Sequence, residues 1–372
     1  MLIQIHILQN YAPANLNRDD TGSPKDAMFG GTRRGRISSQ CLKRSIRKST
    51  AFCEAFEQDN LLGMRTKLLP EQIRNELQAM GVEEAAIQKI VQRVPEIGHK
   101  ASKVEEEDTG ESTPEKTETA TRQLIFIGKN ELRPLAEKLL ALYQETGLQK
   151  WPKVELEKEL GSSLPLSVDI AMFGRMTTSA AFEDVQAAVQ VAHALSTNTL
   201  TQEFDYYTAV DDLSGESGAG MIGDVEFNSS TFYKYLNIHW EELVKNLGGD
   251  REIARRAVLA LVEAAATAQP SGKQNSFAAY NLPDLILVEV SERNLPVSYA
   301  NAFIKPIRAS GDLSVVDVSV EKLGNYLSQV SKVYNLNFKR AFTALQEYSL
   351  PEAKARPSLP ALQTWLIEQL PG

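Results

Sequence analysis

Basic residues gather near the start of the chain. Residues 1–50 hold nine lysines and arginines against three acidic residues, whereas the whole 372-residue chain carries a formal charge of −8. The nine are Arg18, Lys25, Arg33, Arg34, Arg36, Lys43, Arg44, Arg47 and Lys48. Lysine and arginine bind phosphates regardless of base sequence, so a local basic patch on an acidic chain predicts a confined nucleic-acid site. A solvated basic surface is the alternative.

Three polar residues, Ser38, Ser39 and Gln40, precede the densest part of this cluster. Serine is favoured at helix N-caps, so we expect a helix from Ser38 or Ser39 to about Phe56. These side chains and the backbone N–H groups of the first turn could bind the same phosphates. Their other role is simply to cap the helix.

The expected helix has two different faces. At about 100° per residue, Leu42 and Ile46 fall on an apolar side that faces the core. Lys43, Arg44 and Arg47 fall on the other side, next to the basic loop that precedes the helix. The helix therefore presents a basic arc to solvent.

The remaining elements predict an α+β fold. The opening alternation of apolar and polar residues is typical of a half-buried strand, and residues 10–35 show no periodicity and are expected to form a long loop. Further strands are expected at 166–173, 205–213, 225–239 and 282–290, and a helix at 250–268. This order matches the βαββαβ pattern of ferredoxin-like folds, whose open sheet face RNA-recognition domains use.

Two further segments complete the expected organisation. Residues 59–159 look mostly helical and interrupt the ferredoxin-like pattern. Within them, residues 101–120 are acidic and lack aromatic residues, which predicts a disordered linker whose deletion leaves RNA binding intact. Residues 311–372 are expected to form a C-terminal helical region.

Several classes of function find no support. The chain has neither the G-x-x-x-x-G-K-[ST] phosphate loop nor the G-x-S-x-G nucleophile motif. Gly218, Gly220 and Gly223 have dinucleotide-binding spacing but lead into a strand, so we expect a flexible hairpin tip there. The two cysteines and four histidines are scattered, and we expect no metal and no other cofactor. No apolar run is long enough to span a bilayer, so we expect no membrane partner and a cytoplasmic location.

Several strings of residues resemble one known family, the CasC backbone subunits of type I-E CRISPR Cascade surveillance complexes, in the RAMP superfamily. The similarity extends over about 300 residues, with the strings in the family's order. They are LNRDD (16–20), KDAMFGG (25–31), RISSQCLKRSIRKS (36–49), VDIAMFGRMTTS (168–179), TAVDDL (208–213), FYKYLNI (232–238), PSGKQNSFAAYN (270–281) and SYANAFIKPIR (298–308).

The resemblance implies an architecture and a set of partners. The fold would be an RNA-recognition-like palm at 1–58 and 160–310, with helical fingers at 59–159 and a β-hairpin thumb at about 196–226. Copies would assemble head-to-tail into a helical filament along a CRISPR guide RNA (crRNA) and display it for pairing with target DNA in antiviral defence. Other partners would be the guide-processing endonuclease, the subunit that binds the 5′ handle, and the large and small subunits. The chain itself would not be an enzyme.

The resemblance also implies which residues bind nucleic acid. Guide phosphates would be held by Arg18, Lys25, Lys43, Arg44 and Arg47, with Ser38 and Gln40 beside them. Lys273 would approach the same strand or the target, and Lys305 and Arg308 would belong to a later basic cluster. The implied set is Arg18, Lys25, Arg34, Arg36, Ser38, Gln40, Lys43, Arg44, Arg47, Arg175, Lys273, Lys305 and Arg308. Met176 and Ile222 would act as apolar wedges that unpair one nucleotide at a regular interval.

Two other functions stay open at this point. Related backbone subunits of RNA-targeting CRISPR complexes use a loop aspartate to cut RNA, and Asp26 lies in a comparable loop, so the chain could be a metal-dependent ribonuclease. More often, an aspartate in such a place pairs with a neighbouring arginine or caps a turn. The chain could instead be a purely structural scaffold, for which neutralising Lys43, Arg44 and Arg47 would not impair assembly.

Overall fold

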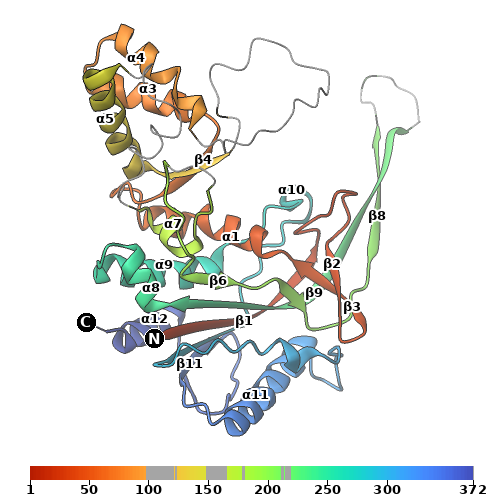
Figure 1. The fold of residues 1–372 in the computed structure, drawn as a ribbon. Coiled ribbons are helices and arrows are strands. Elements are labelled where there is room, and N and C mark those ends of the chain that lie inside the picture. The colour runs from red at the N-terminus through yellow and green to blue at the C-terminus, as the bar shows by residue number, and fades with distance from the viewer. Residues whose placement is uncertain are drawn as a thin grey trace. The chain divides into compact units, whose positions relative to one another are not determined.

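The computed structural model describes residues 1–97, 121, 124–147, 166–177, 181–210, 213 and 219–371 (Figure 1). The acidic segment 101–120 expected to be a linker lies outside these residues. The chain forms two compact units. The first consists of residues 1–52, 190–240 and 255–372, and the second of residues 53–189 and 241–254.

The first unit is built on a large sheet. Its strand order is β12-β11-β10-β1-β9-β7-β3-β2, with β6 and β8 also pairing with β9. The strands are β1 (Leu2–Ala14), β2 (Asp26–Phe29), β3 (Thr32–Ile37), β6 (Val189–Val191), β7 (Ala194–Ser196), β8 (Glu203–Val210), β9 (Ala219–His239), β10 (Leu285–Ser291), β11 (Lys339–Ala344) and β12 (Ala353–Ala355). β1 pairs antiparallel with both β9 and β10, and β11 pairs parallel with β12. A mixed, mostly antiparallel sheet with helices confirms the α+β class.

The helices agree with the sequence in part. α9 (Arg251–Thr267) confirms the helix expected at 250–268, and α11 (Val315–Tyr334) and α12 (Leu359–Gln369) lie in the expected C-terminal helical region. That region also contains β11 and β12, two strands that the sequence analysis did not single out. The first unit also holds α10 (Gln274–Phe277) and the short helix η3 (Ala300–Phe303).

The helix expected from Ser38 to Phe56 is two helices. α1 (Ser39–Arg47) ends where Ser49 intervenes, and α2 (Thr50–Glu54) follows. The Ser49 hydroxyl donates to the Ile46 carbonyl at 2.8 Å and accepts from the Phe52 N–H at 3.2 Å. A serine that binds the backbone in this way competes with helix continuation, which explains the break.

Strand β1 is buried on both faces, not on one as its alternation predicted. Gln4 and His6 are as inaccessible as the isoleucines between them. They lie on the face that α11 covers, which Figure 1 shows running beside the sheet. There His6 Nε2 lies 3.2 Å from the Glu289 carboxylate, and Tyr299 donates to the same carboxylate at 2.9 Å. The polar side chains of β1 are buried because they are hydrogen-bonded.

The second unit packs helices around its own core. It contains α3 (Leu69–Ala79), α4 (Glu84–Val91), η1 (Val94–Glu96), α5 (Lys129–Thr146), α8 (Trp240–Asn246) and the two-stranded sheet β4 (Gly63–Thr66) with β5 (Ile125–Gly128). Ile73, Ile90 and Leu135 are central to the core. The strand expected at 166–173 was wrong, because residues 168–173 form helix α7 (Val168–Phe173). A short apolar run does not distinguish a buried strand from a buried helix.

Candidate nucleic-acid interface

The basic loop contains a β-hairpin. β2 and β3 pair antiparallel around Gly30 and Gly31, which have φ of 60° and 77°. A two-residue glycine turn with positive φ is favoured in hairpins. A Cβ at Gly30 would come within 1.9 Å of the Ile304 carbonyl oxygen, so a side chain does not fit there. The expectation of a long loop over 10–35 was therefore wrong for 26–35, and also for 10–14, which belong to β1; the Gly-Gly pair was the signal for the turn.

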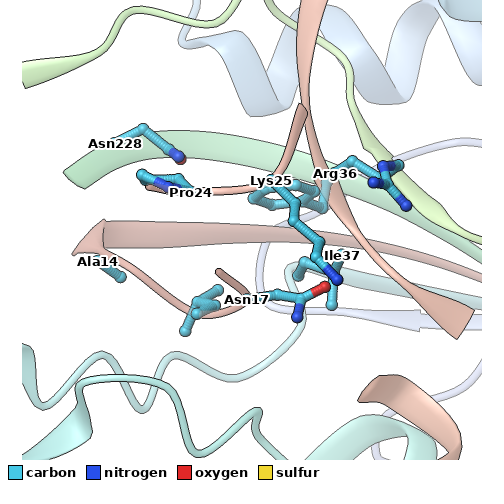
Figure 2. A pocket seen from close by; sticks show the side chains of 9 residues that line it. Ala14, Asn17, Pro24, Lys25, Arg36, Ile37 and Asn228 are labelled. Carbon is cyan, nitrogen blue, oxygen red and sulfur yellow. The ribbon is translucent and has the colours of Figure 1, made fainter. Parts of the chain in front are cut away.

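The hairpin places two cations opposite each other. The pairing of Asp26 with Gly35 continues to Lys25 and Arg36, where the Arg36 N–H donates to the Lys25 carbonyl at 2.8 Å. Both residues, with Asn17, line a small pocket whose other walls include Pro24 and Phe232 (Figure 2). Like charges directly opposite on neighbouring strands destabilise a sheet. A pocket lined by two such charges attracts an anion.

Helix α1 begins beside this pocket. Ser38 is its N-cap: the hydroxyl accepts from the Cys41 N–H at 3.3 Å, and the Ser38 N–H donates to Asn17 Oδ1 at 2.8 Å. Ser38 is buried, so its capping role is established, whereas Gln40 is exposed. Asn17, which the sequence did not single out, therefore links the loop to the helix.

The basic side chains of α1 lie where the helical periodicity predicted. Leu42 and Ile46 are buried, Lys43 and Arg47 are half-buried, and Arg44 is exposed. Burial raises the pKa of the Cys41 thiol, while the charges of Lys25, Arg44 and Lys234 act in the opposite direction. The positive charges of Lys25, Arg44 and Lys234 thus all act on a thiol in the first turn of α1.

His193 joins this cluster without having been predicted. Its Nδ1 accepts a hydrogen bond from the Ser39 N–H at 3.2 Å. Partial desolvation and the charges of Arg36 and Lys25 lower the pKa of His193. Its local sequence carries no signal, because the contact depends on pairing between β3 and β7, which are far apart in the chain.

Two predicted RNA-binding arginines have structural roles instead. Arg34 is fully buried, and its guanidinium donates to Thr32 Oγ1 and to four backbone carbonyls, those of Ser196, Thr197, Phe303 and Ile304. Arg175 is buried in the second unit and forms an ion pair with Glu131 at 2.8 Å. The assignment of both to RNA was wrong, because neither guanidinium is available to a ligand.

The other predicted basic residues are accessible. Arg18 is exposed, and its backbone forms an isolated antiparallel β-bridge with Pro24 at the entry to the hairpin. Lys273 has a left-handed backbone with φ of 50°, and its neighbour Gly272 packs against the carbonyl of Leu16. This packing holds the Lys273 loop against the segment that leads to Arg18. Lys305 and Arg308 are exposed in the segment after η3.

The two predicted wedges are highly exposed apolar side chains. Met176 is 96% exposed in the second unit, and Ile222 is 61% exposed on the hairpin formed by β8 and β9. Gly223, from the glycine motif, pairs with Tyr207 within this hairpin. Gly220 and Gly223 lie within strand β9 and open no helix, which agrees with the expectation that the motif is not a dinucleotide site; Gly218 lies outside the described residues.

Asp26 forms an ion pair with Arg33, with 3.2 Å between the carboxylate and Nε. Its carbonyl accepts from Arg36 Nε at 2.9 Å. Over the described part of the chain, no group of three or more histidine, cysteine and acidic residues is arranged to hold a metal ion. Within the same residues, no helix has the length and apolar character needed to cross a membrane.

Comparisons with known proteins agree with one another. The family model of the CT1975-like proteins matches residues 3–369. A chain of a solved structure described as "CRISPR RNA-guided surveillance complex, pre-nicking" is 30% identical, with a TM-score of 0.80 and 99% of each chain covered. A chain described as "CRISPR RNA-guided surveillance complex" has the same fold at 24% identity, with a TM-score of 0.63 and 99% of each chain covered. A search of curated proteins gave no match.

Proposed function

Since the chain belongs to the family of CT1975-like proteins, we propose that it is a guide-RNA-binding backbone subunit of a CRISPR surveillance complex, of the type I-E Cascade class. The observation that carries the proposal is the facing pair Lys25 and Arg36 in one small pocket beside α1. A phosphate bound near both residues would be attracted by the Lys25 ammonium and by the Arg36 guanidinium. The 30% identity to a chain of a CRISPR RNA-guided surveillance complex supports RNA as the source of that phosphate.

The guide backbone would follow the accessible basic residues of the first unit. Lys25, Arg36, Lys43, Arg44 and Arg47 would hold its phosphates, with Gln40 as a polar neighbour. Arg18 and Lys273, together with Lys305 and Arg308, would extend this contact. Phosphate contacts fix the register of the strand without reading its sequence, as a guide-displaying subunit requires.

The remaining roles follow from the same proposal. The large sheet would be an RNA-recognition-like palm, the second unit would supply the fingers, and the β8–β9 hairpin would be the thumb. Met176 and Ile222 would be inserted between base steps of the guide–target duplex, where apolar side chains unstack nucleotides. Copies of the chain would assemble head-to-tail, because heterologous contacts generate open helical filaments. Target DNA and the other Cascade subunits would complete the assembly in antiviral defence.

Co-expression with the neighbouring subunits would test the proposal. We expect the purified assembly to contain short RNAs of uniform length with repeat-derived ends. The double variant K43M/R47M should bind RNA more weakly and with a smaller salt dependence, because fewer phosphates are neutralised and binding therefore releases fewer counterions. K322M/K354M, which removes two exposed lysines outside the site, is the matched control. Normal assembly and RNA content in K43M/R47M would favour the scaffold alternative.

We propose no catalytic role for this chain. Asp26 is engaged by Arg33, as its alternative structural role anticipated. A guide-loaded assembly incubated with complementary RNA and Mg²⁺ should leave that RNA intact. Periodic cleavage that disappears in Asp26→Ala would establish the ribonuclease instead.

A further inference from the structure

His193 lies on the same face of the sheet as Arg36. Strands β3 and β7 pair antiparallel, with Arg36 opposite Leu195 and Ile37 opposite Ala194. Continuing this register places His193 opposite Ser38, the N-cap of α1. Residues two apart on a strand share a face, so Arg36 and His193 are diagonal neighbours across the pair. Lys25, the residue directly before β2, lies opposite Arg36 and extends the same row.

The hydrogen bond to Ser39 fixes the tautomer of the His193 ring. Nδ1 accepts the Ser39 N–H at 3.2 Å and therefore carries no proton. In a neutral imidazole the single proton then resides on Nε2. The side chain is exposed, and the charges of Arg36 and Lys25 act on the ring, so this N–H donor is open to a ligand near the two cations.

Electrostatics keep the ring uncharged. Partial desolvation, Arg36 and Lys25 all lower the pKa of His193. Protonation would also place a hydrogen on Nδ1, where the Ser39 N–H already points. A lysine or arginine at this place would add a third like charge, whereas a neutral imidazole adds a directed donor without repulsion.

We propose that His193 is a third ligand of the bound RNA backbone: its Nε2–H donates to an oxygen of the phosphate that Lys25 and Arg36 attract. This role rests on the proposed RNA-binding function. It assigns His193 to positioning, because a hydrogen bond constrains the orientation of the phosphate more than charge alone does. No bond to phosphorus forms or breaks, and no proton is transferred.

Two substitutions separate this role from support of helix α1. H193N keeps an acceptor near the Ser39 N–H, through the amide oxygen, and removes the distal donor. H193Q carries an N–H at about the distance of Nε2. The assay measures the dissociation constant of a short fluorescein-labelled single-stranded RNA for the full chain, between about 50 and 200 mM KCl. Thermal unfolding of each variant checks that the fold is retained, and K25M is the charge-removing control.

The expected result is a loss of affinity without a change in salt dependence. H193N should bind about three- to tenfold more weakly at every salt concentration, as the loss of one hydrogen bond predicts, with H193Q closer to wild type. K25M should instead reduce the slope of log Kd against log salt by about 0.7, the value for one phosphate on a single strand.

Three other results would overturn the proposal. Wild-type affinity in H193N would show that the ring only supports Ser39. A reduced salt slope in H193N, like that of K25M, would show that the histidine binds RNA as a cation. If wild type and K25M bind RNA equally, the proposed function itself fails, and K25M distinguishes this case from failure at His193 alone. Ring ¹⁵N shifts give an independent check: Nδ1 should be unprotonated in the RNA-free chain at neutral pH.

Discussion

Lys25, directly before β2, lies opposite Arg36 of β3, and the Arg36 N–H donates a hydrogen bond of 2.8 Å to the Lys25 carbonyl. The nearest carboxylate in the hairpin, Asp26, pairs with Arg33 instead of separating them. Like charges at opposite positions of a strand pair oppose folding, so we expect this pair to lower the stability of the RNA-free protein. Places where a sequence breaks a local rule of stability are often its functional sites.

Neutralising one of these charges should have opposite effects on stability and binding. Lys25→Met keeps most of the aliphatic stem and removes the repulsion, so the free energy of unfolding should rise by about 0.2–1 kcal/mol at low salt. Added salt should shrink this gain because it screens the repulsion in the wild type. Urea unfolding at two salt concentrations measures the effect, with the exposed strand residue Lys354→Met as control. A loss of stability at low salt would show that the two charges do not repel in the free protein.

Two adjacent arginines should differ sharply when replaced. Arg34→Met removes the donors of four backbone carbonyls in a buried place and should lower the free energy of unfolding by about 3–5 kcal/mol. Arg33→Met removes an exposed ion pair with Asp26 and should cost less than about 1 kcal/mol. Urea unfolding compares the two variants directly. Equal costs would mean that the carbonyls around Arg34 find other donors.

This contrast shows what the sequence could and could not reveal about the site. Composition located the basic cluster, and helical periodicity correctly separated Leu42 and Ile46 from the basic face of α1. Arg34 and Arg36 looked equivalent, because both precede the same helix. They differ because the Arg34 guanidinium is buried against the backbone carbonyls of residues 196–197 and 303–304, which are remote in the chain. His193 was missed for the same reason.

The fold shows the same division between local and long-range information. The long helix α9 could be predicted from its apolar composition, and β10 from a short apolar run that is typical of a buried strand. The burial of Gln4 and His6 could not, because it depends on Glu289 and on the cover supplied by α11. Helix α7 was mistaken for a strand because a six-residue apolar segment fits either period.

The buried charged side chains on the face of the sheet that α11 covers interact with one another. Arg340 Nε donates to the Glu289 carboxylate at 2.5 Å, and both side chains are fully buried. Burial alone would raise the pKa of Glu289, but the hydrogen bond and charge of His6, with those of Arg340, outweigh it and lower the pKa. Glu289 is therefore ionised in the folded protein at neutral pH.

Removing either partner of the Glu289–Arg340 ion pair should destabilise the fold, and the effects of the two substitutions should not add. Glu289→Gln removes the buried counter-charge of Arg340, which keeps only its ion pair with the exposed Glu352, and should lower the free energy of unfolding by about 3–5 kcal/mol. Adding Arg340→Met to that variant should cost less than the sum of the single changes, because the stranded charge is removed. A double-mutant cycle by urea unfolding measures the coupling. Strict additivity would contradict an interaction between the two residues.

A buried lysine on the other face of the sheet should make stability depend on pH. Lys234 lies on β9 with its Nζ hydrogen-bonded to Gln9 Oε1 and, at 3.1 Å, to the Tyr11 hydroxyl. Desolvation lowers its pKa to about 7, with the nearby Cys41 thiol acting in the opposite direction. In the unfolded chain a lysine titrates near about 10.4. The unfolded state therefore binds more protons than the folded state across the interval between these two values.

The sign of the effect follows from that difference. Where the unfolded state binds more protons, stability rises with pH, here by up to about 1.4 kcal/mol per pH unit above about pH 7. Raised pH releases the proton from Lys234 in the folded protein and removes the cost of a buried charge. Urea unfolding from about pH 7 to about pH 8.5 should show this rise in the wild type. Lys234→Met should flatten it, whereas Lys322→Met, at an exposed position on α11, should leave it unchanged. A wild-type stability that is constant or falls over this interval would mean that Lys234 keeps its charge in the fold, and that Gln9 and Tyr11 solvate its Nζ as well as water does.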